Sequence, residues 1–332
     1  MQIDETAGSP PPPFVLAITA DTHLQHDAVA LPDPSGFPQG TVSVLMHCGD
    51  FESSAKLEAW LATQLHRGYS HALVVCGNHD KTYKALDRPG TPGWRDAPPY
   101  QVALARSIAA QTAIKGFRGN SVIRSAVMLN DAAVTLASGE HTLRVHGMPY
   151  HVRQPGTNTL TNCHFQHSEE DLAKPCERID DATDVLMTHA GPIGCLDLAN
   201  GGQTQLGSAA LRERVEELPR LAAHAFGHVH AAQPVPADHE PVLQVVAQRK
   251  KKGVLVPVKR VKGLDTRAVR RAATGALFVN AAGMKVPAGQ HRLVHADDPQ
   301  AAQRAPVVMR LDRAVNGVWR ASVMASVLEH SA

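Results

Sequence analysis

The sequence predicts an α/β fold, and the alternation of strand-like and helix-like segments supports this prediction. The clearest case begins with Val42–Cys48, continues with an apolar stripe from Leu57 to Leu65, and ends with Ala72–Cys76. These are an apolar run, an amphipathic segment and a second apolar run. A strand, a helix and a strand with short links form a βαβ unit, so we expect the two strands to be parallel. At 332 residues, the chain can form one large domain or two smaller ones.

Further strands and helices are expected along the rest of the chain. Apolar runs predict strands at Phe14–Ala20, Val185–Thr188, Ala222–Phe226 and Ala276–Asn280. Alternating patterns predict two hairpins, Ser125–Ser138 with His141–His146 and Val307–Leu311 with Val318–Met324. Serine side chains are suitable N-caps for three helices, at Ser53 or Ser54, at Ser168 and at Ser208. Gly68 is suited to end the first of these helices.

Composition is that of an ordinary globular protein, with 43% hydrophobic and 19% charged residues. The five cysteines are odd in number and contain no C-x-x-C pair, which favours a reducing compartment and argues against a zinc finger or a disulfide scaffold. No apolar run approaches the roughly 20 residues that cross a bilayer. We therefore expect a cytoplasmic protein without a membrane partner, and the sequence leaves the oligomeric state open.

Positive charge is concentrated in residues 249–271, which contain ten Lys or Arg and one acid, although the whole chain has a net charge of only +2. Such a segment can bind a polyanion such as nucleic acid. A solvated basic insertion is the commoner explanation, and we favour it. Residues 249–252 also permit a nuclear location as an alternative to a cytoplasmic one.

Polar side chains that can bind metals follow several of the predicted strands. The run Val74–Cys76 breaks at Gly77 and is followed directly by Asn78, His79 and Asp80. Ligands of open α/β sheets gather just beyond the carboxyl ends of the strands, so this position suggests a site. The same construction recurs four more times, with Asp21 and His23, with Asp50, with His189, and with His228 and His230.

The spacing and chemistry of these residues favour a metal centre. In Asp-Thr-His and His-Val-His the two outer side chains point to one side of an extended segment. Carboxylate, imidazole and amide groups together suit divalent Mn, Fe, Zn or Mg. Seven ligands are too many for one ion, whereas two ions roughly 3.5–4 Å apart and bridged by a carboxylate would use them all. Any one of these histidines alone is more often a core or surface residue than a ligand.

Taken together, these motifs resemble the five conserved blocks of the calcineurin-like metallophosphoesterases. The blocks occur in order as residues 21–23, 49–50, 77–80, 189 and 227–230. Residues 47–51 and 186–197 are similar to the metallophosphoesterase-domain-containing group, which is related to class III cyclic-nucleotide phosphodiesterases. The resemblance implies a four-layer αββα sandwich of two mixed β-sheets flanked by helices. We expect a disordered Pro-rich segment at 1–13 and a single domain at 14–325, with insertions at about 86–99, 151–167 and 232–274.

The resemblance also implies a role for each motif residue. One metal would be held by Asp21, His23 and His230, and the other by Asn78, His189 and His228, with Asp50 bridging the two. His79 would face the leaving group as the catalytic acid, and Asp80 would orient His79. The cofactors implied are two divalent metal ions, with Mn favoured among Mn, Fe, Zn and Mg.

The expected activity is hydrolysis of a small phosphoester, with a phosphodiesterase favoured and cyclic nucleotides among its candidate substrates. A hydroxide activated by the two metals would attack phosphorus in line. The alternatives are a phosphomonoesterase, a nuclease, or a weakly active scaffold protein that retains the fold. Asn78, His79 and Tyr150 are candidates for substrate contact. Packing is an equally good explanation for Tyr150. Asn280 can brace a loop of the metal site, although capping a strand is the commoner role for such a residue.

Overall fold

The computed structural model describes residues 13–81, 125–153, 164–199, 204–230, 276–282, 306–314 and 317–324. Between residues 239 and 271 it also describes the backbone of four short strands, which are β13, β14, β15 and β16. The expected insertion at 86–99 lies outside the described residues, as do the side chains of the basic segment 249–271. The sequence of residues 101–115 also predicts a helix, and this segment lies outside the described residues as well. The prediction for that segment therefore stays a prediction.

Six strands form the first sheet, in the order β19-β18-β1-β2-β3-β4. The first four strands in the chain are parallel to one another, whereas β18 is antiparallel to β1 and β19 is antiparallel to β18. The bounds are β1 Phe14–Thr19, β2 Val42–Cys48, β3 His71–Val75, β4 Ser125–Met128, β18 Val307–Arg313 and β19 Trp319–Val323. The expected parallel pairing of β2 and β3 and the expected closing hairpin are both confirmed.

Seven strands form the second sheet, in the order β13-β16-β17-β12-β9-β6-β5. Its central strands β6, β9, β12 and β17 are parallel, and antiparallel strands flank them on both sides. The bounds are β5 Ala132–Ser138, β6 His141–Met148, β9 Val185–Thr188, β12 Ala223–Phe226, β13 His239–Pro241, β16 Ala268–Arg271 and β17 Leu277–Asn280. Both sheets are thus mixed, as expected.

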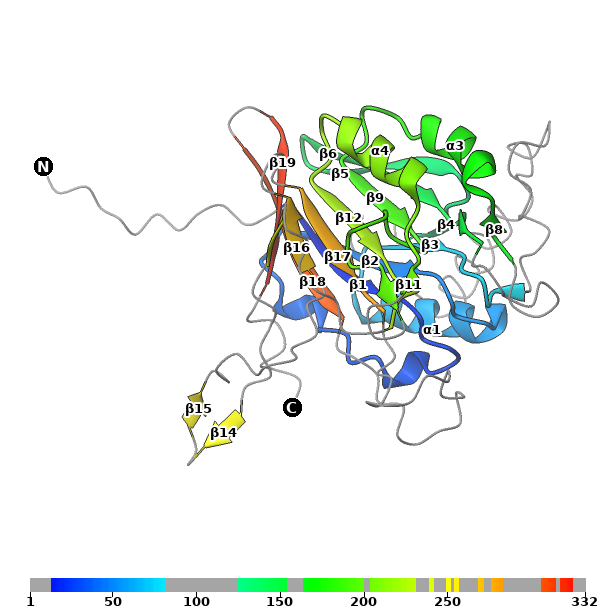
Figure 1. The fold of residues 1–332 in the computed structure, drawn as a ribbon. Coiled ribbons are helices and arrows are strands. Elements are labelled where there is room, and N and C mark those ends of the chain that lie inside the picture. The colour runs from blue at the N-terminus through cyan, green and yellow to red at the C-terminus, as the bar shows by residue number, and fades with distance from the viewer. Residues whose placement is uncertain are drawn as a thin grey trace, which may run out of the picture.

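The two sheets pack face to face and helices cover their outer faces (Figure 1). Side chains alternate along β1, so that Leu16 and Ile18 join the apolar core between the sheets, whereas Val15 and Ala17 join the cluster that includes the helices. Helix α1 (Ser54–Arg67) lies outside the first sheet, and α3 (Glu169–Glu177) and α4 (Ala209–Glu217) lie outside the second. This arrangement confirms the predicted four-layer αββα sandwich.

The helix boundaries follow the predicted capping residues. The Ser53 hydroxyl accepts a hydrogen bond from the backbone N–H of Lys56, and α1 ends at Gly68, where φ is 127°. Ser168 and Ser208 cap α3 and α4 in the same way. Each such cap stabilises its helix by about 1 kcal/mol.

Short elements connect these layers. The 3₁₀ helices η1 (His26–Ala28) and η2 (Pro34–Gly36) lie between β1 and β2. Three two-stranded sheets pair β7 His151–Val152 with β8 Gln166–His167, β10 Leu198–Ala199 with β11 Thr204–Gln205, and β14 Arg249–Lys251 with β15 Val254–Val256. The ends of the expected 151–167 insertion therefore form regular structure, and residues 154–163 lie outside the described residues.

The predicted single strand over Ser125–Ser138 is wrong. Residues 125–128 form β4, which pairs with β3 in the first sheet, and residues 132–138 form β5, which pairs with β6 in the second. Between them the chain crosses from one sheet to the other and turns at Asp131, where φ is 50°. An alternating pattern reveals that a segment is a strand but does not identify its sheet, so it could not predict this crossing.

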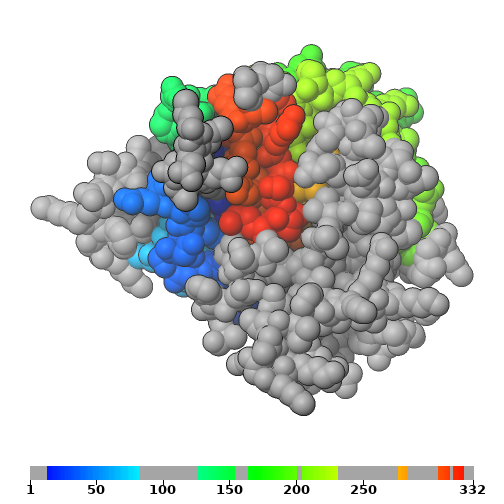
Figure 2. Space-filling view, turned by 90° about the vertical axis from the view of Figure 1, so that its left-hand side faces the viewer, coloured from blue at the N-terminus to red at the C-terminus, as the bar shows by residue number. Residues whose placement is uncertain are grey.

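The C-terminal hairpin forms one edge of the first sheet and contacts the second. In Figure 2 its strands β18 and β19 lie in the middle of the face shown. The Trp319 ring packs edge-on against Phe14 of β1 with centroids 5.5 Å apart, and its indole N–H donates to the carbonyl of Thr142 in β6 at 3.1 Å. Trp319 is 2% exposed, so one side chain links the two sheets.

Among the described helices, none is long and apolar enough to span a bilayer.

Replacement of Trp319 by Ala is expected to lower the free energy of unfolding by about 3–5 kcal/mol, because it empties a buried site and leaves the Thr142 carbonyl without its donor. Urea unfolding followed by circular dichroism measures this loss. The matched control is Val318→Ala, since Val318 is 36% exposed and its truncation should change stability by about 0.5 kcal/mol or less. Equal losses in the two variants would contradict the linking role of Trp319.

Candidate metal centre

All seven predicted ligands lie at the carboxyl ends of strands from both sheets. Asp21, Asp50 and Asn78 follow β1, β2 and β3 of the first sheet. His189, His228 and His230 follow β9 and β12 of the second sheet, and His23 follows β1 with Asp21. The structure therefore brings together the whole predicted set, as expected for side chains at the carboxyl edges of parallel strands.

Two glycines allow the sheets to approach each other at this edge. A Cβ atom on Gly227 would collide with the carboxylate of Asp21, and one on Gly77 would collide with the carboxylate of Asp50 and lie 2.6 Å from Cε1 of His189. Any larger residue would separate the ligands. This close approach accounts for the glycine that precedes each of these motifs.

The first group of ligands consists of Asp21, His23 and His230, each of which offers one ligand atom within 4.8 Å of the others. Nε2 of His230 lies 2.9 Å from Oδ1 of Asp21, and the backbone N–H of His228 donates to Oδ2 of Asp21 at 2.9 Å. Nδ1 of His23 lies 2.7 Å from the carboxylate of Glu52, to which it donates. Nε2 of His23 is buried and has no hydrogen-bond partner among the described residues, so its lone pair is available to a cation.

Asp50 lies between the two groups. Its Oδ2 is 3.4 Å from Nε2 of His189 and 4.0 Å from Nε2 of both His23 and His79. Its Oδ1 accepts the backbone N–H of His79 at 2.8 Å. A carboxylate in contact with the imidazoles of both groups has the geometry that a bridging ligand requires.

The second group is built around His189. Its Nδ1 donates to the carbonyl of Cys48 at 2.8 Å, and its Nε2 lies 3.1 Å from Oδ1 of Asn78. His228 faces His189, with ring centroids 4.9 Å apart. A histidine that donates one ring N–H to a carbonyl presents its other nitrogen as a ligand, which is the usual arrangement at metal sites.

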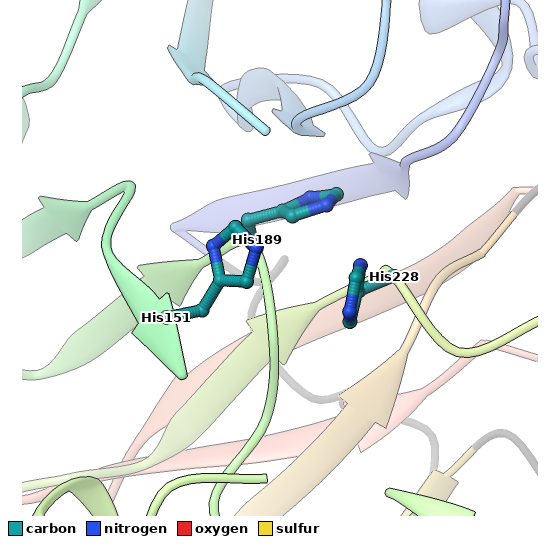
Figure 3. A group of neighbouring side chains, drawn as sticks. All are labelled: His151, His189 and His228. Atoms are coloured by element: carbon teal, nitrogen blue, oxygen red, sulfur yellow. The ribbon is translucent and has the colours of Figure 1, made fainter. Parts of the chain in front are cut away.

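His151 is a member of this second group that the sequence analysis missed. Figure 3 shows its ring beside those of His189 and His228, and one nitrogen of each ring lies within 4.8 Å of the others. Residue 151 was expected in an irregular insertion, although it follows the strand His141–Met148 closely. That strand-end position was the available signal, but His151 lacks the D-x-H or H-x-H spacing of the other ligands.

The predicted role of Asp80 differs from what the structure shows. Its two carboxylate oxygens accept backbone N–H groups of Gly77, Asp50, Phe51 and Glu52 at 2.7–2.9 Å. Asp80 thus fixes the backbone that carries Asp50 and does not orient the ring of His79. Because backbone N–H groups donate to both oxygens, the carboxylate holds together the loops that follow β2 and β3.

Tyr150 and Asn280 have clear structural roles. Tyr150 is 1% exposed, and its ring packs against Phe165 and His167, which agrees with the packing explanation. The side-chain amide of Asn280 donates to the carbonyls of Leu196 and Val229 at 3.2 and 3.0 Å. Val229 lies between the two histidines of the H-x-H motif, so Asn280 braces a loop of the site, which was the less common of its two predicted roles.

The backbone of the site is strained. Asp21, His23, Asp50, Glu52 and His228 all have positive φ angles, between 41° and 69°. Non-glycine residues enter this region at a cost of order 1–3 kcal/mol each and cluster at functional sites. The surrounding hydrogen bonds hold these residues in conformations that aim their side chains inward.

Charge compensation controls protonation in the cluster. Burial disfavours the charged form of Asp50, but the nearby imidazoles of His189, His79 and His23 hold its pKa well below the usual range. Burial also opposes protonation of His189, yet the charges of Asp50 and Asp21 raise its pKa to about 9. For His79 burial prevails, and its pKa is lowered despite the charge of Asp50.

The donor set fits two divalent cations. The first group has carboxylate and imidazole donors, and the second has imidazole and amide donors, with Asp50 between the groups. The buried, unpartnered Nε2 atoms of His23 and His151 are the ligand atoms that a cation would satisfy. Which ions bind, and with which residues, stays a prediction.

Binding of a divalent cation to the metal-free protein at about pH 7 is expected to release a proton, because His189 must lose the proton that its raised pKa of about 9 retains. Affinity should therefore fall by about tenfold for each pH unit below that pKa. Calorimetric titrations in buffers of different ionisation enthalpy count the released protons. Uptake without proton release, with affinity constant over this pH range, would contradict the protonation state assigned to His189.

Comparison with known proteins identifies relatives of this chain. Residues 14–232 match the sequence profile of the calcineurin-like phosphoesterase family. A UPF0046 protein of Caenorhabditis elegans is 28% identical over 67% of this chain and 67% of its own length. Human metallophosphoesterase domain-containing protein 1 is 24% identical over 71% of this chain and 66% of its own length. A second UPF0046 protein of Caenorhabditis elegans is 28% identical, and the match spans 60% of this chain and about half (48%) of that relative.

A similar solved structure is the phosphopantetheinyl hydrolase of Mycobacterium tuberculosis. It aligns over 89% of this chain and 96% of its own, with 13% identity and a TM-score of 0.43. The family match covers most of the sandwich and every one of the strand-end motifs. The chain belongs to the calcineurin-like phosphoesterase family, whose members are metal-dependent phosphoester hydrolases.

Proposed function

We propose that the protein is a metal-dependent phosphodiesterase that uses two divalent cations. The observation that carries this proposal is the position of Asp50, whose Oδ2 contacts imidazoles of both ligand groups. When bound, the cations lower the pKa of a water molecule and neutralise charge on the phosphoryl group. Asp21, His23 and His230 would hold one of them, and Asn78, His189 and His228 the other. Mn²⁺ suits the first of these positions because two carboxylates contribute to it.

His79 is the group best placed to act on the leaving oxygen. Its backbone is fixed by Asp50, and its side chain is 16% exposed, whereas those of Asp50 and His189 are 3% and 0% exposed. A substrate that approaches from solvent therefore reaches the His79 ring. Protonated at Nε2, this ring can donate a proton to the departing alkoxide.

The preference for a diester follows from the charge of the cluster. The described side chains that form it are histidines, carboxylates and an amide, and none of them is Arg or Lys. A diester carries one negative charge at phosphorus, whereas a monoester dianion carries a second charge that Arg or Lys commonly binds. Cyclic nucleotides belong to the diester class and are our first candidate substrates.

The proposed activity is tested with a panel of esters under Mn²⁺ supplementation. We expect kcat/KM to be about tenfold or more higher for bis-p-nitrophenyl phosphate than for p-nitrophenyl phosphate. Cyclic nucleotides and linear dinucleotides extend the panel. Asp50→Asn is the matched inactive control, because it removes the shared carboxylate charge with little change in volume. Faster hydrolysis of the monoester would overturn the diester preference, and metal binding without any hydrolysis would favour a scaffold protein.

His79→Ala is expected to lower kcat on a diester with a poor leaving group by about 10²–10⁴-fold while bound metal is unchanged. With p-nitrophenolate as the leaving group the loss should be much smaller, because that group needs no proton. Since burial lowers the pKa of His79, its contribution to kcat should decline as pH rises through a value below the usual 6.5 or so. Full activity of His79→Ala on the poor leaving group would show that another residue is the acid.

A further inference from the structure

His151 is buried against the second ligand group, and its hydrogen bonding leaves one ring nitrogen free. The side chain is 2% exposed, and its ring centroid lies 5.0 Å from that of His189 and 4.9 Å from that of His228 (Figure 3). Nδ1 lies 3.2 Å from the carbonyl of Pro149, which can only accept, so Nδ1 carries the proton. Nε2 has no hydrogen-bond partner within the part of the chain that the structure describes.

A purely structural role does not explain this arrangement. A buried polar atom without a partner lowers the stability of the fold, and an apolar side chain of similar size would avoid that cost. His189 shows the same pattern, since its Nδ1 donates to a backbone carbonyl and its Nε2 faces the site. The hydrogen bonding of His151 thus matches that of His189, which is one of the predicted ligands.

The backbone around His151 holds the ring in place. The N–H of His151 donates to the carbonyl of Phe165 at 2.9 Å, and that of Arg153 donates to the carbonyl of His167 at 2.8 Å, so β7 is paired with β8. Tyr150 is anchored in the apolar core directly before it. A ligand whose backbone and rotamer are fixed in advance loses little entropy on binding a cation.

We propose that His151 is a further ligand of the cation position formed by Asn78, His189 and His228, which becomes a three-imidazole site. This proposal rests on the proposed function, because it requires that the centre binds metal. It also makes the two positions chemically unequal. Imidazole-rich sites suit Zn, Fe and other borderline cations, whereas carboxylate-rich sites suit Mn and Mg. The second position therefore selects a borderline transition-metal ion, and the first accepts a harder one.

Metal titration of the full-length protein tests this proposal without reference to activity. Metal-free wild type should bind two equivalents of Zn²⁺. His151→Gln should bind the equivalent at the three-imidazole position about 10–100-fold more weakly and the other equivalent with unchanged affinity. The loss should be greater for Zn²⁺ than for Mn²⁺, since Mn²⁺ depends less on imidazole. His167→Ala is the matched control, because His167 lies on the paired strand β8 outside the ligand groups.

A crystal structure of the Zn²⁺-loaded wild type, with anomalous scattering from zinc, gives a direct answer that needs no variant. We expect Nε2 of His151 at a coordination distance of about 2.0–2.1 Å from one ion. The proposal would be overturned if folded His151→Gln bound Zn²⁺ at the position of Asn78, His189 and His228 as tightly as wild type does. It would also be overturned if the His151 ring contacted added phosphate in place of zinc. If His151→Gln does not fold, the zinc position in the wild-type crystal decides. A wild type that binds no metal would overturn the proposed function as well, so the two failures are distinguishable.

Discussion

The centre depends on the carboxylate of Asp80, which joins the loops that follow β2 and β3. Four backbone N–H groups donate to it, three from residues 50–52 and one from Gly77. These bonds hold Asp50 and Glu52 at positive φ, a conformation that neither residue adopts readily. Without Asp80 the two loops would relax, and both the carboxylate of Asp50 and the neighbouring His79 would lose their positions. Asp80, which among the described residues bonds only to backbone N–H groups, therefore sets the geometry of the candidate ligands.

Asp80 can hold the two loops only while its carboxylate accepts hydrogen bonds, and its surroundings have opposite effects on its pKa. Burial and the charge of Asp50 raise its pKa to about 7, while the amide hydrogen bonds from Gly77 and Glu52 favour the ionised form. Two buried carboxylates so close together are tolerable only where positive charge compensates them. The imidazoles of the cluster supply part of that charge, and divalent cations would supply the rest. Binding of cations here would therefore be coupled to the integrity of these loops.

The sequence was most informative where local chemistry decides the outcome. It located β2 and β9 to the residue, and the predicted serine caps begin all three described α-helices. It also identified seven side chains that the fold brings together, because strand ends in a parallel sheet share an edge. What it could not supply was pairing across long distances. The crossing between β4 and β5 depends on which sheet each strand joins. The alternation of apolar and polar residues does not indicate that choice.

Two components of the site were missed for the same reason. His151 lies in no motif although it follows a strand end, and its backbone is held beside the cluster by the pairing of β7 with β8, some 15 residues further along the chain. Glu52 follows Asp50 closely in sequence, yet its contact with Nδ1 of His23 exists only because β1 and β2 are neighbours. The ring of His151 lies beside those of His189 and His228, and Glu52 fixes which nitrogen of His23 is free. Such supporting contacts are visible only in three dimensions, since many spacings in the sequence can produce them.

The distribution of ligands between the sheets gives the metals a structural consequence as well as a chemical one. Asp50 and Asn78 belong to the first sheet, whereas His189 and His228 belong to the second, so a cation bound among them would join the two layers at their carboxyl edge. Trp319 links the same layers elsewhere, through Phe14 and Thr142. The free energy of metal binding therefore adds to that of folding, because the unfolded chain cannot assemble the site. The side chains at this edge are polar and cannot pack against one another as an apolar core does. Bound cations would neutralise and ligate them, and would thereby supply the cohesion that apolar packing supplies elsewhere in the sandwich.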